Sequence, residues 1–255
     1  MLSENDKQRY SKQIILPEIG EAGQERLSSA SVLVIGAGGL GCPVLQYLAA
    51  AGIGKIGVVD FDTVDISNLQ RQVLYTEKDL NQSKSETAKN KIQEINSVIE
   101  VVSLNVKITS ENILSVIQPY DIVVDGTDNY ETKYLINDAC VILDKPLVFG
   151  SIYKYHGQLS VFNHHDGPTY RCVFPTPART DNCNETGVVG VLPGIVGTMM
   201  ANEVIKIIIG LGEILSGTLL VIDSLTLEIS RYYFTAVEEN KRVKTLNSNL
   251  FYNTD

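Results

Sequence analysis

The sequence predicts an α/β fold: a Rossmann-like, mostly parallel sheet with helices on both faces, extended by antiparallel strands in the C-terminal half. Over the first 150 of the 255 residues, short β-branched and aliphatic runs alternate with segments typical of helices. Such alternation indicates parallel strands that are covered on both faces. The first repeat, residues 31–60, has the size of one βαβ unit. Beyond Gly150, two further strand-like runs look like antiparallel additions.

The elements are predicted in order along the chain. A helix, a break at Leu16-Pro17 and Gly20, and a second helix to about Ala30 are expected first. Strands are predicted at 31–35, 56–60, 99–105, 122–125, 146–149, 156–162 and 217–223. Helices are predicted at 43–51, 83–96, 110–117 and 130–143. Residues 164–187 carry prolines, glycines, Asn and Asp, and their length favours a functional crossover or lid.

Composition excludes several classes of protein. With 44% hydrophobic and 20% charged residues, the chain is expected to be globular. No segment is rich enough in Pro, Gly or Ser to act as a linker, so one domain over residues 1–255 is expected. The net charge of −9 without a basic block disfavours binding to nucleic acid. Four cysteines without C-x-x-C spacing, and no signal peptide before them, predict a cytoplasmic protein.

The segment from Gly187 to Asn202 is uncharged and mostly apolar. At sixteen residues it is shorter than the ~20 that a membrane-spanning helix requires, and Glu203 and Lys206 follow at once. We therefore predict a buried helix and no contact with a membrane.

A glycine-rich turn links a predicted strand to a predicted helix. Its glycines are Gly36, Gly38, Gly39 and Gly41. Asp60 lies nineteen residues beyond the last of them, at the tip of the next strand, which is the spacing of dinucleotide-binding folds. Glycines let the backbone approach phosphate, the helix N-terminus offers free N–H groups, and the carboxylate accepts from ribose hydroxyls. On this motif alone NAD is the leading ligand, and a purely structural turn is the alternative.

Residues just past the second strand favour a triphosphate. They are Asp62, Ser67, Asn68, Arg71 and Lys84. Arg71 and Lys84 can neutralise phosphate oxygens, and Asn68 can act as a directional donor, whereas hydride transfer needs no such fixed cations. The alternative is that both cations lie at the surface, as most Arg and Lys residues do.

Asp128 follows the strand 122–125, at the end of the sheet where open α/β folds bind their ligands. Its carboxylate can hold Mg²⁺ against phosphates. Alternatively, Asp128 caps the helix that begins near Tyr130. Thr127 and Asn129 are the other candidates for that cap.

Together these motifs closely resemble the adenylyltransferases that activate ubiquitin-like sulfur-carrier proteins, the MoeB, ThiF and HesA group, themselves similar to ubiquitin-activating enzymes. The likeness runs from R-Y-S-K-Q-I (9–14) through G-A-G-G-L-G, D-F-D-T-V, S-N-L-Q-R-Q and D-G-T-D-N to Y-R-C (170–172) and G-V-V-G (187–190). The S-N-L-x-R-Q motif, together with the other motifs in this order, is highly specific for this group. The resemblance implies a nucleotide-binding half over about 1–150 and a carrier-binding and crossover-loop half over about 151–255.

The resemblance further implies that ATP and Mg²⁺ are used to adenylylate the C-terminal Gly-Gly carboxylate of a small sulfur carrier. The products are an acyl-adenylate, for later thiocarboxylation, and pyrophosphate. Residue matching puts Gly39 at the phosphates, Asp60 at the ribose and Asp128 at the metal. It puts Asn68, Arg71 and Lys84 at the triphosphate. The other residues assigned to the nucleotide are Gly36, Gly38, Gly41, Asp62, Ser67 and Asn129.

A homodimer is implied as well, in which an arginine from the N-terminal segment of one subunit reaches the other's site. Lys12 stands at that position here and keeps the charge without the bidentate fork of arginine. Arg9 is the alternative. The resemblance also suggests a cysteine desulfurase or a rhodanese-type sulfur donor. The apolar segment 188–209 and the strands beyond Gly150 are expected to build the carrier groove and the dimer interface.

The cysteines depart from the pattern of many relatives, which bind a structural zinc through two C-x-x-C pairs. This chain keeps only Cys172 of those ligands, has Thr169 at the first position, and has no cysteine in residues 238–255. No zinc site is therefore expected.

Cys183 matches the crossover-loop cysteine that bonds covalently to the carrier in thiamine-type relatives, and joins Arg71, Lys84 and Asp128 in the assigned catalytic set. The alternative is a passive thiol, because no His or Lys lies beside it. Cys42 and Cys140 are predicted to be small core residues. His156, His164 and His165 also suggest a metal site. The adjacent loop histidines His164 and His165 lack a third partner, however, and are expected to face solvent.

Three rival functions remain at this point. An NAD-dependent oxidoreductase shares the glycine turn. A relative that acts on tRNA shares the ATP site, but the charge of −9 disfavours it. A noncatalytic carrier-binding partner is the third, and the complete set of cations and Asp128 weakens it. The residues do not distinguish a carrier of the molybdopterin pathway from one of the thiamine pathway.

Overall fold

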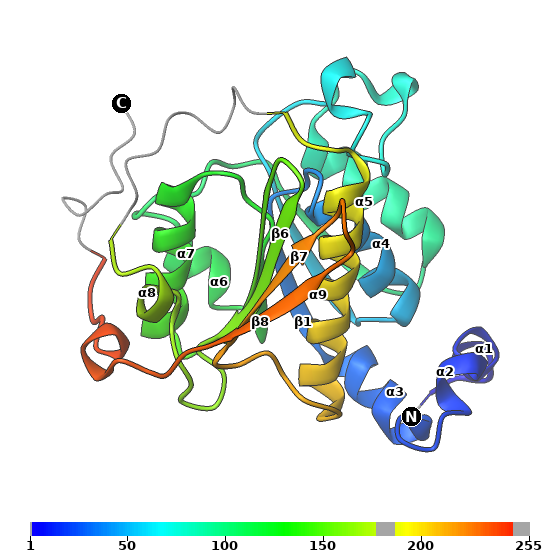
Figure 1. Ribbon diagram of the computed structural model, residues 1–255. Helices are drawn as coiled ribbons and strands as arrows, with labels where there is room; N and C mark the ends of the chain where they lie inside the picture. The colour runs from blue at the N-terminus through cyan, green and yellow to red at the C-terminus, as the bar shows by residue number, and fades with distance from the viewer. Residues whose placement is uncertain (1, 177–186, 247–255) are drawn as a thin grey trace.

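The computed structural model describes residues 2–176 and 187–246. In these ranges the chain forms one eight-stranded sheet with the order β3-β2-β1-β4-β5-β6-β7-β8 (Figure 1). The strands are β1 (Ser31–Ile35), β2 (Lys55–Val59), β3 (Glu100–Leu104), β4 (Ile122–Asp125), β5 (Leu147–Tyr153), β6 (His156–Phe162), β7 (Thr218–Asp223) and β8 (Ile229–Tyr233). The strands from β3 to β5 pair in parallel, and those from β5 to β8 pair antiparallel. The predicted fold class is therefore confirmed.

Helices cover both faces of the sheet (Figure 1). The α-helices are α1 (Glu4–Arg9), α2 (Ser11–Ile14), α3 (Gly20–Ser29), α4 (Gly41–Ala51), α5 (Lys84–Ile95), α6 (Ile113–Ile117), α7 (Tyr130–Ile142), α8 (Tyr170–Val173) and α9 (Val191–Ile209). Short 3₁₀ helices are η1 (Ile66–Asn68), η2 (Glu77–Asp79) and η4 (Glu238–Lys241). One face of the sheet packs against α4, α5 and α9, and the other packs against α6, α7 and α8.

β1 shows how the sequence produces this layering. Val32 and Val34 point into the core formed with α4, α5 and α9, whereas Leu33 and Ile35 point into the core on the other face. All four side chains are buried, which explains why the strand is a continuous apolar run rather than an alternating one. β1 pairs with β2 on one side and β4 on the other, so the strand order reverses beside it. Ligand sites of open α/β sheets lie at such a reversal.

The apolar helix near residue 190 begins and ends later than predicted, at Val191 and Ile209 rather than 187 and 202. In the described part of the chain it is the one helix that is long and apolar enough to cross a membrane, but half of its apolar window, 50%, is buried inside the protein. α9 packs against α4, β5 and β6. The carboxylate of Glu203, 3% exposed, accepts from the Leu215 N–H at 3.0 Å. These contacts support the interpretation of α9 as a core helix.

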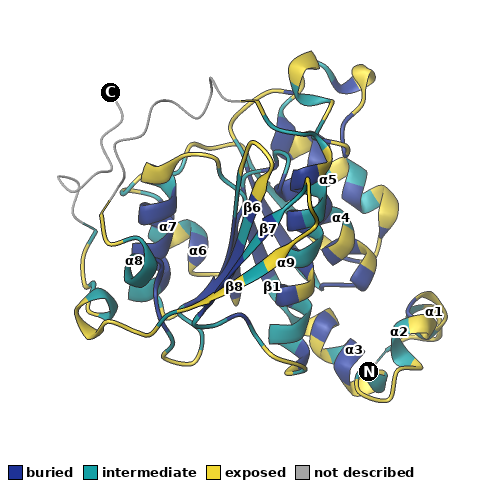
Figure 2. Cartoon of the chain, viewed as in Figure 1, coloured by how far each residue is buried: buried dark blue, intermediate teal, exposed yellow. Residues whose placement is uncertain are grey.

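In the described C-terminal half, β8, α8 and the short η4 were not predicted by the sequence pattern. β8 extends the sheet beyond β7 and is mostly exposed, as Figure 2 shows. α8 lies within the stretch 164–187 that was expected to be a loop. β5 also continues past its predicted end to Tyr153, because residues 147–153 pair along their whole length with β6.

Candidate functional site

A cavity of about 760 Å³ lies where β1, β2 and β4 reach their carboxyl ends. Its walls come from the glycine turn after β1, the residues after β2, the loop 126–129 after β4, the start of α7 and residues 151–154. The basic side chains in the lining are Arg71, Lys84, Lys107, Lys133 and Lys154. The acidic ones are Asp60, Asp62, Asp128 and Glu131. Such a mixture suits an anionic ligand that arrives with a divalent cation.

The glycine turn begins with a residue that only glycine suits. Gly36 has φ +94°, and a Cβ on it would lie 2.8 Å from the carbonyl oxygen of Gly126. Its N–H donates to the Val59 carbonyl at 2.8 Å, which fixes the turn to β2. Gly38 and Gly39 line the cavity, whereas Gly41 does not: a Cβ there would overlap the Gly36 carbonyl oxygen. Gly41 therefore serves close packing within the turn.

Replacing Gly36 with alanine is expected to destabilise the protein by about 1–3 kcal/mol, because the positive φ and the contact with Gly126 both oppose a methyl group. Gly38→Ala is the matched control, since its Cβ would meet only the Gln72 amide at 3.6 Å. It is expected to unfold within about 1 kcal/mol of the wild type. Urea unfolding of both variants measures the difference, and equal midpoints would contradict the strain at Gly36.

Asp60 lies at the cavity wall with its carboxylate held by the backbone. Oδ2 accepts from the Ala37 N–H at 2.8 Å, and Oδ1 accepts from the Asp62 N–H at 2.9 Å. Burial raises the pKa of this carboxyl, while the two backbone hydrogen bonds work in the opposite direction. Each carboxylate oxygen has capacity for a second donor, so Asp60 can still accept from a ribose hydroxyl.

Lys84 is the first residue of α5 and is 6% exposed, so the alternative that it is a surface cation is wrong. Its Nζ lies 3.1 Å from Oδ2 of Asp62, and its N–H donates to the Asp62 carbonyl at 2.9 Å. Both residues line the cavity. An ammonium group has three N–H donors, so Lys84 can bind an anion while it keeps its pairing with Asp62.

Arg71 is half-buried and lines the same cavity. Its Nη1 donates to the Ser67 carbonyl at 3.1 Å, which holds the guanidinium along η1. Ser67 and Asn68 do not belong to the cavity lining. The Ser67 hydroxyl donates to Asp65, and the Asn68 amide donates to the Ser67 hydroxyl at 3.3 Å. Of this predicted group, the structure brings Arg71 to the site and leaves Ser67 and Asn68 beside it.

Asp128 was predicted either to hold a metal or to cap α7, and the hydrogen bond of the next residue decides between these two roles. Asn129 is the N-cap of α7, and its Oδ1 accepts from the Thr132 N–H at 2.9 Å. Asp128 is exposed and lines the cavity. The interpretation of Asp128 as the helix cap is therefore wrong, and its carboxylate faces the cavity without that task. Asn129 lines the cavity as well, with its amide oxygen used by the cap.

Several cavity residues were not predicted from the sequence, and two of them, Lys133 and Gln72, are buried polar side chains. Lys133, on the first turns of α7, is 3% exposed and pairs with Asp125. Gln72, 4% exposed, has an Oε1 that is buried without a hydrogen-bond partner in the described structure. The signal for Lys133 was a cation directly before the apolar run 134–136 of a predicted helix. The signal for Gln72 was its place at the end of S-N-L-Q-R-Q.

Other predicted residues lie outside this cavity. Lys12 is exposed on α2, and Arg9 donates from Nη1 to the Ile95 carbonyl at 3.2 Å. Neither lines the cavity of its own chain, so their contact with a second subunit stays a prediction. Cys183 falls within 177–186, outside the described residues. Cys42 and Cys140 are fully buried, and burial raises the pKa of the Cys42 thiol to about 12, which confirms them as core residues.

Cys172 takes part in hydrogen bonds that hold the segment before η4. Its Sγ accepts from the N–H groups of Val237 at 3.3 Å and Thr169 at 3.4 Å. In residues 2–176 and 187–246, no three His, Cys, Asp or Glu side chains are arranged to hold a metal ion. The lack of a structural zinc remains a prediction for the chain.

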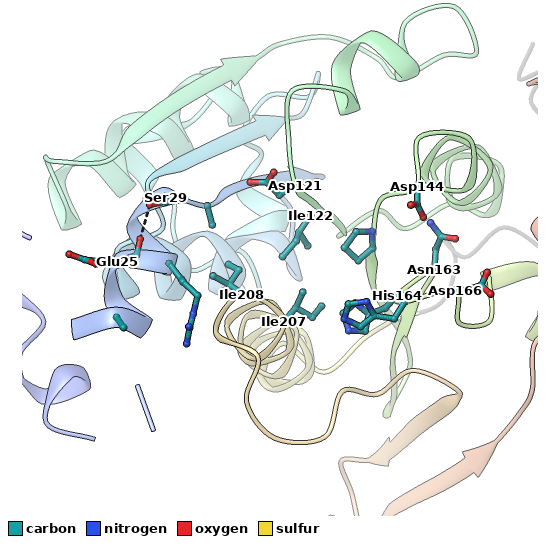
Figure 3. Close-up of a pocket in the computed structure, with 15 residues that line it drawn as sticks. Glu25, Ser29, Asp121, Ile122, Asp144, Asn163, His164, Asp166, Ile207 and Ile208 are labelled. Carbon is teal, nitrogen blue, oxygen red and sulfur yellow. Dashed lines mark hydrogen bonds between the residues drawn. The ribbon is translucent and has the colours of Figure 1, made fainter. Parts of the chain in front are cut away.

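A second cavity, of about 690 Å³, lies at the amino ends of the parallel strands, away from the glycine turn. His164 lies at its wall near Asn163 and Asp166, as Figure 3 shows. Burial and the neighbouring His165 lower the pKa of His164. His164 is therefore partly buried rather than solvent-facing, whereas His165 is exposed as predicted. His156 is exposed as well.

The model of the ThiF family matches residues 10–244. The chain belongs to the ThiF family. A sulfur carrier protein adenylyltransferase of Thermus thermophilus is 52% identical over 225 residues, which cover 85% of this chain and 83% of that protein. The family likeness predicted from the motifs is therefore confirmed.

Other proteins similar to this chain are longer. The adenylyltransferase and sulfurtransferase MOCS3 of Culex quinquefasciatus is 52% identical over 87% of this chain, and this chain spans 51% of it. A probable molybdopterin-synthase adenylyltransferase of Porphyra purpurea is 47% identical over 93% of this chain and 65% of that protein. Among solved structures, E. coli MccB superposes with a TM-score of 0.81 at 24% identity, over 92% of this chain and 73% of MccB. That likeness shows a shared fold.

Proposed function

We propose that this protein is an ATP-dependent adenylyltransferase. It transfers AMP to the C-terminal Gly-Gly carboxylate of a small ubiquitin-like sulfur-carrier protein and releases pyrophosphate. The observation that carries the proposal is the convergence of Arg71, Lys84 and Asp128 on one cavity beside the glycine turn. The names of relatives about 50% identical, a sulfur carrier protein adenylyltransferase and a MOCS3 protein, support the substrate class.

The chain's own groups supply the positioning and part of the charge neutralisation. Gly38 and Gly39 leave room for phosphates at the start of α4, and Asp60 accepts from the ribose. Lys84 and Arg71 stabilise the negative charge on the phosphate oxygens as the carrier carboxylate attacks the α-phosphorus and pyrophosphate leaves. The attacking carboxylate is already ionised at neutral pH, so no side-chain base is required.

The donor set at the cavity fits Mg²⁺. Asp128 supplies an exposed carboxylate that is not used as a cap, and this ion favours one or two carboxylates together with phosphate oxygens. When bound, Mg²⁺ would neutralise the triphosphate. Asp62 is paired with Lys84 and is a poorer candidate for a ligand.

The reaction needs partners that lie outside this chain. We infer a homodimer in which Lys12 or Arg9 of one subunit reaches the phosphates of the other. A cysteine desulfurase or rhodanese-type protein is the proposed sulfur donor for the adenylate, and Cys183 is the candidate for a covalent bond to the carrier. A cytoplasmic location, and a pathway that makes molybdopterin or thiamine, belong to the same proposal.

An NAD-dependent oxidoreductase is the second candidate, because the turn and Asp60 also suit a dinucleotide. The buried Lys84 and the exposed Asp128 in the same cavity argue against it, since hydride transfer needs neither. A noncatalytic carrier-binding partner predicts carrier binding without ATP turnover. Pyrophosphate exchange separates the adenylyltransferase from the other two functions, and the binding of NAD and of the carrier separates those two from each other.

The deciding experiment is ATP–pyrophosphate exchange with Mg²⁺ and purified carriers ending in Gly-Gly, one of the molybdopterin type and one of the thiamine type. Exchange is expected with at least one carrier and not with the same carrier lacking its last glycine. A small open reading frame ending in Gly-Gly beside this gene would identify the carrier to try first. Absence of exchange with every carrier, together with tighter binding of NAD than of ATP, would favour the oxidoreductase.

A further inference from the structure

We propose that Lys133 is a positioning residue for the loop 126–129, and thereby for Asp128. The inference rests on the proposed adenylyl transfer for its catalytic consequence, but its geometry stands on the described structure alone. Lys133 has no assigned part in the nucleotide site, and among the cations that line the cavity in the described residues it is the most buried, at 3% exposed. The side chains of Lys133 and Asp125 are 4% and 1% exposed.

Lys133 joins three elements at the carboxyl ends of the parallel strands. From α7 its Nζ lies 3.2 Å from Oδ2 of Asp125, the last residue of β4. The same Nζ donates to the carbonyl of Gly150 in β5 at 3.1 Å. It also lies 4.9 Å from the centre of the Phe149 ring, which favours the cation further. One ammonium group thus fixes α7 against β4 and β5.

Asp125 transmits this fixation to the loop. Its second oxygen, Oδ1, accepts from the Thr127 N–H at 2.9 Å and from the Thr127 hydroxyl at 2.6 Å. One oxygen is therefore tied to the helix after the loop, and the other is tied to the residue before Asp128. At the far end, the Lys133 N–H donates to the Asn129 carbonyl at 3.3 Å. This bond belongs to the helix backbone and is kept in every side-chain variant, so the side chain of Lys133 acts on the loop through Asp125.

Stability alone is a poor reason for two charges at this depth. A buried ion pair is often replaced by apolar residues of similar volume without loss of stability, because desolvation of the charges offsets their attraction. An apolar pair, however, would supply no hydrogen bond to Gly150 and no acceptor for Thr127. The Lys133 ammonium contacts Asp125, Gly150 and the ring of Phe149, so we assign it the positioning of the loop.

The test compares Lys133→Arg, Lys133→Met and the double variant Asp125→Asn/Lys133→Met. The double variant removes both charges, so no lone buried carboxylate is left, and the new amide oxygen can still accept from Thr127. It keeps the test valid if Lys133→Met alone does not fold. Lys91→Met is the matched control, because Lys91 also pairs with a largely buried aspartate, Asp79 at 3.2 Å, away from the cavity.

Two readouts are measured on each folded variant. The first is kcat against KM for ATP in pyrophosphate exchange, and the second is ATP binding by calorimetry with and without Mg²⁺. Loss of the tether is expected to lower kcat about 10- to 100-fold, as loss of an outer partner of a metal ligand does, with a smaller change in KM. ATP binding should weaken with Mg²⁺ present and stay unchanged without it. Lys133→Arg should recover most of the activity, and Lys91→Met should resemble the wild type.

The possible failures are distinguishable. Folded Lys133→Met or double variants with wild-type kcat and wild-type Mg²⁺-dependent binding would overturn the role of Lys133. A wild type that binds ATP with Mg²⁺ but exchanges no pyrophosphate would overturn the proposed function, while the binding difference between variants would still decide the role of Lys133. A wild type that binds no ATP would overturn both.

Discussion

Replacing Lys84 with methionine is expected to lower the rate of carrier adenylylation on the order of 100-fold, which is the loss seen when one donor to a developing negative charge is removed. Lys84 is buried at the cavity wall, where its charge is weakly screened by water and acts strongly on a phosphate. Methionine keeps most of the aliphatic length of the side chain. The Asp62 carboxylate left behind is 54% exposed, so solvent can stabilise it and the fold should survive.

The measurement is pyrophosphate exchange at saturating ATP, together with thermal unfolding of each variant. Lys78→Met is the matched control: Lys78 is exposed on η2, only six residues earlier, and does not line the cavity. It should keep the wild-type rate. A Lys84→Met protein with an unchanged melting temperature and an undiminished rate would remove Lys84 from the mechanism and return weight to the oxidoreductase.

Most of the sheet could be predicted because a buried strand has a recognisable pattern of apolar residues in the sequence. The central strands β1 and β4 are covered on both faces, and each appears in the sequence as a continuous apolar run. β8 has no such apolar run. Its residues I-S-R-Y-Y are mostly exposed, and the strand forms by backbone pairing with β7. Hydrophobic periodicity cannot predict a strand that is held by backbone hydrogen bonds to its neighbour and has no buried face.

The residues of the candidate site that directly follow strands of the parallel sheet could be predicted from the sequence. Asp60, Arg71, Lys84 and Asp128 follow β2 or β4, and parallel strands bring their carboxyl ends together, so these residues meet in one cavity. The direction of individual side chains depends on helix geometry and packing. Neither the burial of Lys133 nor the choice of Asn129 as the cap can be obtained from spacing alone. The assignment of Lys12 or Arg9 depends on a second subunit, which no single-chain pattern specifies.

Replacing Asp128 with asparagine is expected to reduce pyrophosphate exchange at low Mg²⁺ by at least about 10- to 100-fold, the range found when even an outer partner of a metal ligand is lost. The change preserves shape and removes the negative charge that attracts the cation. Because Asp128 is exposed and the cap of α7 belongs to Asn129, the melting temperature should not change. The readout is the Mg²⁺ concentration that gives half-maximal exchange, which should rise in the variant.

Asn129→Ala is the matched control for Asp128→Asn, because it changes the adjacent residue and is expected to affect helix stability rather than Mg²⁺ binding. Loss of the 2.9 Å bond to the Thr132 N–H should cost about 1 kcal/mol of stability in urea unfolding. The half-maximal Mg²⁺ concentration should stay near that of the wild type, since the carboxylate is intact. If instead Asp128→Asn unfolds more easily and keeps the wild-type Mg²⁺ requirement, Asp128 supports the helix and holds no metal.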